Sequence, residues 1–174
     1  MNVSTKNVLA ERNQFFKGHG VSIGSETSGW ITNVTIRDSV LNGTDKAVRI
    51  KSARGRGGGV ADVAYQNLRG SAKTGISLSL EYDESDPTNE SATPALKNIR
   101  VENVTVAADA AYVECLGLND SAIEDVSFVD VAVSGASAQT CSYCAIAHDG
   151  VAPPLKDACT GEASATPMSR RTAP

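Results

Sequence analysis

Short runs of alternating apolar and polar residues recur along the chain, separated by small, polar residues that favour turns. Clear examples are "NVTIRDSVL", which begins at Asn33, and "NIRVENVTV", which begins at Asn98. Alternation with a period of two is typical of a strand that buries one face. The pattern therefore predicts a protein built from many short strands. The low aromatic content of 5% and the abundance of Gly, Ser, Thr, Asn and Val agree with this and disfavour a helical bundle.

The strand-like runs form a repeat. Five segments align without gaps, and each opens with Asn or Asp followed by Val or Ile; they begin at Asn7, Asn33, Asp62, Asn98 and Asp125. A second Asn or Asp stands five positions later in four of them, at Asp38, Asn67, Asn103 and Asp130. The spacing is in the high twenties, with one longer interval that contains the acidic, proline-containing segment 81–95, which we expect to be an inserted loop.

A second, shorter strand is predicted after each of these segments; the sequences are "GVSIG", "AVRIKS", "GISLSLEY", "AYVECLGL" and "CAIAHDG". Two short strands per repeat indicate a parallel β-helix in which each repeat is one coil and stacks on the next. Inward residues such as Val34 and Ile36 would then lie over their counterparts in the neighbouring coil. The alternative, an antiparallel sandwich, explains the alternation but not the regularly placed asparagines.

The composition indicates one domain and excludes several partners. With 174 residues, of which 41% are hydrophobic, the chain has enough apolar residues for a single core. We expect the domain to cover residues 1–160 and the polar tail, 161–174, to be disordered. The net charge of -4 gives no reason to expect a nucleic-acid or anionic-membrane partner. No apolar run is long enough to span a membrane, and the first residues lack the features of a signal peptide.

Candidate chemistry lies in two short segments that follow one another in the first two coils. His19 stands between two glycines in "KGHGVSIG", and Gly permits backbone conformations that would turn the imidazole toward a groove. Arg49 and Lys51 flank the inward Ile50 and therefore point outward on one face. Two adjacent cations indicate a site for a carboxylate-bearing ligand. The alternative is an ordinary solvated strand, and the proximity of His19 one coil away favours the site.

These residues resemble a known family. "GHGVSIGSE" followed by "VRIK", together with the later "GLNDSAIEDVSF", is similar to glycoside hydrolase family 28, the polygalacturonases and their relatives. The resemblance implies an all-β, right-handed parallel β-helix of about five coils and a secreted or cell-wall parent protein. It also implies inverting hydrolysis of the α-1,4-galacturonosyl bonds of pectin, without a cofactor, by a monomer. By this resemblance, His19 would assist catalysis beside the scissile bond, and Arg49 and Lys51 would hold the carboxylate of the acidic polysaccharide.

The catalytic aspartates of that family precede its histidine, and the 18 residues before His19 contain no aspartate. We therefore expect the chain to be an N-terminally truncated, C-terminal part of a family member, inactive alone. The other acidic residues of this region, expected at turns or coil corners with structural roles, are Glu26, Asp38, Asp45 and Asp62. The alternative function is a non-catalytic β-helix that binds acidic polysaccharide or serves as a scaffold.

Four cysteines are present: Cys115, Cys141, Cys144 and Cys159. "CSYC" has the spacing of metal ligands, but without a second pair of cysteines we expect no metal site. The resemblance implies a disulfide between Cys144 and Cys159 and an oxidising compartment. Cys115 has the parity of an inward residue, which predicts a buried free thiol.

The missing aspartates lead to a first prediction. The purified 174-residue chain should not depolymerise polygalacturonate, because glycoside hydrolysis by inversion needs a carboxylic acid and a carboxylate on opposite sides of the bond. The measurement is the release of reducing ends over time against a buffer control. Sustained release by the purified chain would contradict the prediction.

Overall fold

The computed structural model describes residues 3–82 and 92–161, and almost all regular structure in them is strand. The elements in chain order are β1 (Thr5–Glu11), β2 (Gln14–Phe16), β3 (Val21–Ile23), β4 (Trp30–Lys51), β5 (Gly59–Ser79), β6 (Ala95–Leu116), β7 (Ile123–Ser134), β8 (Gln139–Ser142), β9 (Cys144–Asp149) and the short helix α1 (Asp157–Thr160).

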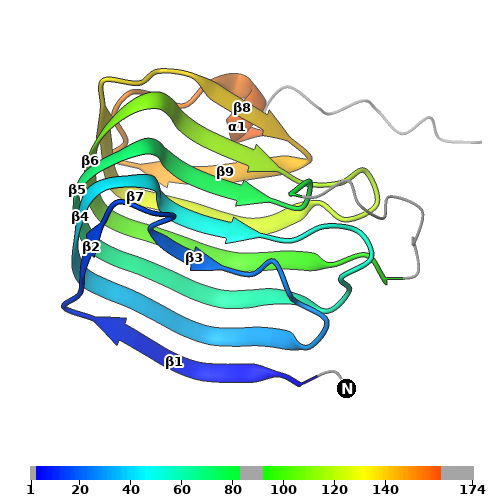
Figure 1. Cartoon of the computed structure of the whole chain (residues 1–174). Helices are drawn as coiled ribbons and strands as arrows, with labels where there is room; N and C mark the ends of the chain where they lie inside the picture. The colour runs from blue at the N-terminus through cyan, green and yellow to red at the C-terminus, as the bar shows by residue number, and fades with distance from the viewer. Residues whose placement is uncertain (1–2, 83–91, 162–174) are drawn as a thin grey trace, which may run out of the picture.

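The strands form a parallel β-helix. Hydrogen-bonded neighbours follow the order β1-β4-β5-β6-β7-β9, with β2 and β3 beside β4 and β8 beside β6. Each of these pairs is parallel. Figure 1 shows the long strands β4, β5 and β6 stacked on one another, each bending round one edge of the molecule and returning on the opposite wall. The predicted β-helix is confirmed and the antiparallel sandwich is wrong.

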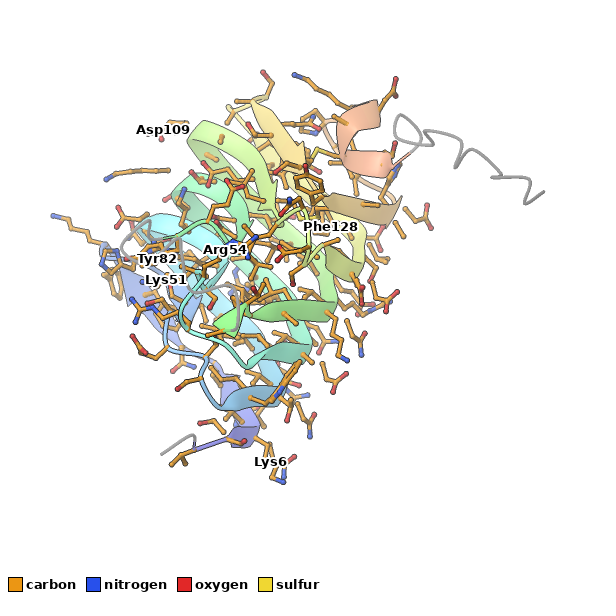
Figure 2. The ribbon with its side chains drawn as sticks, turned by 90° about the vertical axis from the view of Figure 1, so that its right-hand side faces the viewer. Lys6, Lys51, Arg54, Tyr82, Asp109 and Phe128 are labelled. Atoms are coloured by element: carbon orange, nitrogen blue, oxygen red, sulfur yellow. A yellow bond between two sulfur atoms is a disulfide. The ribbon has the colours of Figure 1, made fainter. Side chains whose placement is uncertain are left out.

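The core lies inside the coils and is built from stacked columns of like residues. Val34 pairs with Val63, which pairs with Ile99, which in turn pairs with Val126. All of these are at most 5% exposed, as the predicted alternation requires. Aromatic rings are also fully buried, among them Phe128, which Figure 2 labels. Because each side chain contacts its counterpart one coil away, burial is continuous along the axis.

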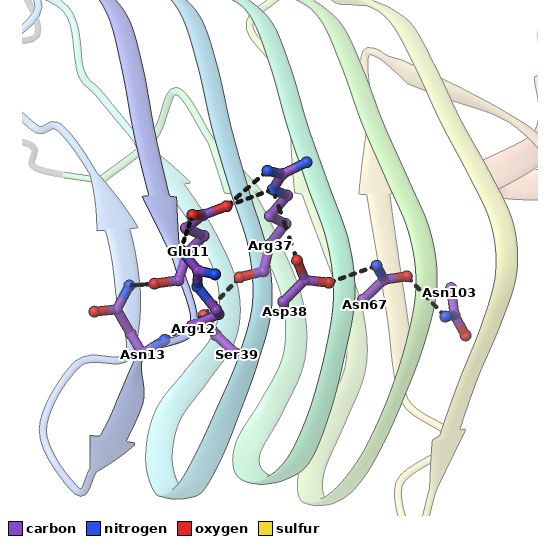
Figure 3. A network of polar contacts seen from close by, with 8 residues as sticks. All are labelled: Glu11, Arg12, Asn13, Arg37, Asp38, Ser39, Asn67 and Asn103. Carbon is purple, nitrogen blue, oxygen red and sulfur yellow. Dashed lines mark hydrogen bonds and ion pairs between the residues drawn. The ribbon is translucent and has the colours of Figure 1, made fainter.

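The regularly placed Asn and Asp residues form the corners of the coils. All of them adopt the left-handed backbone conformation, with φ between 50° and 61°: Asn7, Asn33, Asp38, Asp62, Asn67, Asn98, Asn103, Asp125 and Asp130. Short amides and carboxylates tolerate this conformation better than other side chains. Their side chains also bond between coils: Asn103 donates to Asn67 over 2.8 Å, and Asn67 donates to Asp38 over 2.7 Å (Figure 3).

The first coil departs from this ladder. Arg12 occupies the position that Asp38 and Asn67 occupy in later coils, with φ 56°, and it forms an ion pair with Glu11. Glu11 also accepts hydrogen bonds from Arg37 Nε over 2.9 Å and from Arg37 Nη2 over 2.6 Å (Figure 3). Charge pairs thus join the first two coils at the corner where amides join the later ones.

The last coil differs from the prediction. "CAIAHDG" was expected to be the second strand of the fifth coil, but β9 pairs with β7 and so begins a further coil. The second-strand place belongs to β8, which pairs with Val113–Leu116 of β6. The reason is the left-handed Tyr143, φ 47°, which turns the chain out of β8 after only four residues.

The disulfides also differ from the expected pairing. Cys115 bonds to Cys144 and Cys141 bonds to Cys159, so the expected Cys144–Cys159 bridge is wrong and Cys115 is not a free thiol. Cys115 is fully buried, as its parity predicts. Its partner is Cys144 because β9 starts a new coil and brings Cys144 over the end of β6. The second bridge fastens α1 against β8.

Two predicted irregular segments fall largely outside the description. Glu81, Tyr82 and residues 92–94 of the expected loop lie outside the strands, and residues 83–91 are outside the described residues. Of the tail expected to be disordered, 161–174, only Gly161 is described.

At the first coil, β1 pairs with β4 along one edge, and Val8, Leu9 and Phe16 are 40%, 55% and 66% exposed.

The corner ladder makes a stability prediction at Asn67. Replacing Asn67 by Ala removes both ladder hydrogen bonds and leaves a β-carbon in the left-handed region, which should cost about 2 kcal/mol of unfolding free energy. Asn67→Gly is the matched control, because Gly adopts this conformation freely, and it should cost about 1 kcal/mol. Chemical denaturation measures both, and equal losses would show that backbone conformation contributes nothing.

Candidate functional site

His19 is presented by the tight connection between β2 and β3. Gly18 and Gly20 on either side have φ of 65° and 72°, in the left-handed region. A β-carbon on Gly20 would lie 2.0 Å from the carbonyl oxygen of Lys46, so this position admits only glycine. The Asp45 amide donates to the Gly18 carbonyl over 2.7 Å. The loop is therefore held against β4.

The imidazole of His19 bonds to an aspartate in the next coil. His19 Nδ1 lies 2.8 Å from Asp45 Oδ2, and Lys73 Nζ donates to Asp45 Oδ1 over 3.0 Å. The hydrogen bond from Lys73, followed by that from His19, lowers the pKa of the Asp45 carboxyl, so Asp45 is ionised at neutral pH. The sequence analysis expected Asp45 at a coil corner with a structural role. Asp45 lies within β4, two residues after the left-handed Gly43, and its carboxylate bonds to His19, a contact that was not expected.

Arg49 and Lys51 point outward from the second half of β4, on either side of the fully buried Ile50. The buried hydroxyl of Tyr65 donates to the Arg49 carbonyl over 3.0 Å and so supports this part of the strand from inside. Outside, both cations lie over the ring of Tyr82, with Lys51 Nζ 3.9 Å and Arg49 Cζ 5.4 Å from its centroid. Figure 2 shows Lys51 and Tyr82 together on one side of the molecule.

Tyr82 was not singled out from the sequence. The available signal was its place at the end of "GISLSLEY", one coil after "AVRIKS". A ring stacked on two neighbouring cations reduces their repulsion and orders their long side chains.

A pocket of about 430 Å³ lies between His19, Asp45 and Arg49. It is lined by His19, Asp45, Lys46, Arg49, Lys73, Thr74, Ala110 and Glu114. The structure thus brings His19 and Arg49 together, although they are separated by a coil in sequence. Lys51 is not among the lining residues and lies next along β4, beside Tyr82.

Several charges near the pocket are neutralised by partners in other coils. Lys46 Nζ donates to Glu114 over 2.8 Å and to Thr74 over 3.0 Å. Arg54 and Arg56, which follow β4 in the chain, form ion pairs with Asp120 and Glu26 respectively. Arg54 lowers the pKa of the Asp120 carboxyl. Lys73 is paired with Asp45, so the positive charge available to a ligand comes from Arg49 and Lys51, which contact the ring of Tyr82.

The remaining acidic candidates have structural positions, as expected. Glu26 pairs with Arg56, and Asp38 and Asp62 accept ladder hydrogen bonds from Asn67 and Asn98. The carboxylates that line the pocket, Asp45 and Glu114, are both bonded to cations. The pocket therefore presents cations and an imidazole to a ligand.

Within residues 3–82 and 92–161, no group of three or more His, Cys, Asp or Glu side chains is arranged to hold a metal ion. In the same two stretches, no helix has the length and apolar character needed to cross a membrane.

Comparison with known proteins identifies the family. The profile of Glycosyl hydrolases family 28 matches residues 1–159, and the chain belongs to this family. It is similar to a protein named probable endopolygalacturonase II from Aspergillus niger, with 31% identity over 130 residues, 71% of this chain and 36% of the relative. It is also similar to an endo-polygalacturonase from Pectobacterium carotovorum, with 36% identity over 103 residues, 58% of this chain and 24% of the relative.

A solved structure supports the fold. The crystal structure of a hyperthermoactive exopolygalacturonase from Thermotoga maritima superimposes with a TM-score of 0.69 and 24% identity, covering 86% of this chain and 34% of that chain. The chain thus spans about a quarter to a third of the length of these relatives.

The approach of Gly20 to Lys46 makes a testable prediction. Gly20→Ala places a β-carbon against the Lys46 carbonyl and should cost about 3 kcal/mol of unfolding free energy, because clash and backbone strain add. Gly18→Ala is the control, since nothing lies within 4 Å of its β-carbon, and it should cost about 1 kcal/mol from backbone strain alone. Thermal or chemical denaturation compares them, and equal costs would contradict the close approach.

Proposed function

We propose that this β-helix binds the galacturonate carboxylates of pectin or polygalacturonate, as part of a polygalacturonase-type glycoside hydrolase. The observation that carries the proposal is the convergence of His19 and Arg49 in one pocket, with Lys51 next along β4. Membership of a glycosyl hydrolase family and relatives named endopolygalacturonase support the substrate class.

The two cations of β4 suit a uronate for different reasons. A guanidinium presents a planar pair of donors that matches a carboxylate, whereas an ammonium acts as a compact point charge. Arg49 and Lys51 project in the same direction from one rigid strand, and Tyr82 lies against both of them. A carboxylate placed between them would gain both interactions at a small cost in side-chain ordering.

His19 occupies the same pocket as Arg49, on the side of the preceding coil. A sugar whose carboxylate is held by Arg49 would have its ring hydroxyls or glycosidic oxygen near the imidazole. In the proposed role, His19 assists catalysis by hydrogen bonding there, beside the scissile bond.

Hydrolysis with inversion requires two further groups, a carboxylic acid that protonates the leaving oxygen and a carboxylate that activates water. Neither carboxylate of the pocket fits the acid. Lys73 and His19 lower the pKa of Asp45, and Glu114 is bonded to Lys46. We therefore propose that this chain supplies substrate binding and that bond cleavage depends on carboxylates other than these two.

The paired carboxylates also favour a second candidate, a non-catalytic β-helix that binds acidic polysaccharide. Both candidates require binding, and only the first requires turnover in a protein that also contains the acid and base. As part of either proposal, the protein acts as a monomer in an oxidising compartment, secreted or at the cell wall. Its two disulfides support that location.

The binding proposal predicts a selective effect of removing the cations. Arg49→Gln and Lys51→Met together should weaken binding of a galacturonate oligomer by about 100-fold, because two charge-assisted contacts are lost, each worth about 1.5 kcal/mol. Isothermal titration calorimetry of the folded chain with trigalacturonate provides the measurement. The methyl-esterified oligomer serves as the matched ligand without charge.

Lys97→Met is the matched control variant. Lys97 Nζ also lies over an aromatic ring, that of Trp30, at 5.5 Å from the centroid, but Lys97 does not line the pocket. Its affinity for the acid oligomer should equal that of the unmodified chain. The proposal would be overturned if the Arg49→Gln/Lys51→Met variant bound trigalacturonate as tightly as the unmodified chain does. It would also be overturned if the unmodified chain bound the acid oligomer and its methyl ester equally well.

A further inference from the structure

We propose that Asp45 is a positioning residue that fixes the His19 imidazole as its Nδ1–H tautomer, and that Lys73 holds the Asp45 carboxylate for this purpose. The three residues come from three successive coils: His19 from the connection before β3, Asp45 from β4 and Lys73 from β5. The function of the oriented ring rests on the proposed function, but its tautomer does not.

The hydrogen bond itself determines the tautomer. His19 Nδ1 lies 2.8 Å from Asp45 Oδ2. An ionised carboxylate only accepts hydrogen bonds, so the proton between these atoms belongs to the imidazole nitrogen. In the neutral ring the second nitrogen, Nε2, then carries a lone pair and no proton. The imidazole thus presents an acceptor at Nε2.

Lys73 completes the arrangement because the carboxylate is held at both of its oxygens. Oδ2 faces His19, and Oδ1 accepts from Lys73 Nζ over 3.0 Å. The strand register produces this contact, since Thr44 pairs with Ala72 and Lys46 pairs with Thr74, which puts Asp45 beside Lys73. Bonds at both oxygens oppose rotation of the carboxyl group, so the acceptor for His19 stays in one place.

The charged neighbours of this trio are engaged elsewhere or lie further along the pocket. Lys46 bonds to Glu114 and Thr74, and Arg49 lies over Tyr82. His19 itself is 74% exposed at its side chain and stands between two glycines. A ring with so little packing depends on a hydrogen bond for its orientation, and Asp45 provides one from the adjacent coil.

The consequence for a bound sugar follows from the free lone pair. A neutral His19 held in this way accepts a hydrogen bond at Nε2 from a sugar hydroxyl and, once protonated, donates from the same atom. A ring held by its Nδ1 nitrogen offers a single atom to the substrate, in a fixed direction. Orientation of this kind lowers the entropy cost of each contact.

Nitrogen NMR tests the tautomer without a substrate. Long-range proton–nitrogen spectra of the uniformly ¹⁵N-labelled chain, recorded at alkaline pH where imidazole rings are neutral, distinguish Nδ1–H from Nε2–H. The chain has two histidines, so exposed His148 is an internal reference. We expect protonated Nδ1 and unprotonated Nε2 for His19. The Nε2–H form in the unmodified chain would overturn the proposal without any variant.

Two variants and one control variant separate the role of Asp45 from that of Lys73. Asp45→Ala should convert His19 to the mixture of tautomers expected of the exposed His148. Asp109→Ala removes another exposed carboxylate that interacts electrostatically with Lys73, and it should leave the Nδ1–H form. Lys73→Met keeps the acceptor and therefore the tautomer. Lys73→Met should raise the pKa of the Asp45 carboxyl, because the hydrogen bond from Lys73 is the main cause of its lowered pKa. Carboxyl ¹³C NMR measures that pKa.

The results that test the positioning of His19 are distinct from the results that test sugar binding. An unchanged His19 tautomer in Asp45→Ala overturns the role of Asp45, and an unchanged Asp45 pKa in Lys73→Met overturns that of Lys73. Trigalacturonate added to the unmodified chain should shift the Nε2 signal. If the tautomer is as expected and trigalacturonate shifts no signal, the proposed substrate is wrong and the positioning of His19 stands.

Discussion

The fold depends on one repeated constraint: at each corner of the coil, the backbone must turn through the left-handed conformation while the strands on both sides stay hydrogen-bonded to the coils above and below. Asn and Asp meet it because their side chains tolerate the conformation and bond to the corner of the next coil. Because the two corners of a coil lie five residues apart in each of these coils, the apolar residues between them superimpose. The core, the outer walls and the candidate site are consequences of that registration.

The site illustrates how a solenoid assembles chemistry from distant residues. His19, Asp45 and Lys73 are each roughly one coil apart in sequence and meet through two hydrogen bonds on the outer wall. A coil advances by only about 4.8 Å, which is the distance that a pair of polar side chains spans comfortably. Asp45 and Lys73 lie on neighbouring strands of a continuous sheet, and His19 lies on a loop whose Gly18 carbonyl accepts a hydrogen bond from the Asp45 amide. Tyr82 and Tyr65 add support to Arg49 from outside and from within.

The sequence predicted the fold, the inward residues, the corners, the outward direction of Arg49 and Lys51 and the exposed His19, because each of these follows from local alternation or local backbone preference. It did not predict the partners of Cys115 and Cys144, the start of a new coil at β9 or the contact of Asp45 with His19. These depend on which residues become neighbours between coils, and turn lengths that vary from coil to coil determine that. The left-handed Tyr143 separates β8, which pairs with β6, from β9, which pairs with β7. The role of His19, Arg49 and Lys51 in sugar binding stays a proposal.

The ion pair between Lys46 and Glu114 reaches across an intervening strand, from β4 to β6, and touches Thr74 on the way. The coils of a solenoid resemble one another, so a characteristic folding error is a shift of the chain by one coil. Apolar contacts between adjacent coils hardly distinguish the native arrangement from the shifted one, because similar apolar residues occupy the same column in each coil. A bond between opposite charges two coils apart does distinguish them, because omitting or exchanging a coil leaves both charges unmatched. The pair thus discriminates the native winding from its near copies.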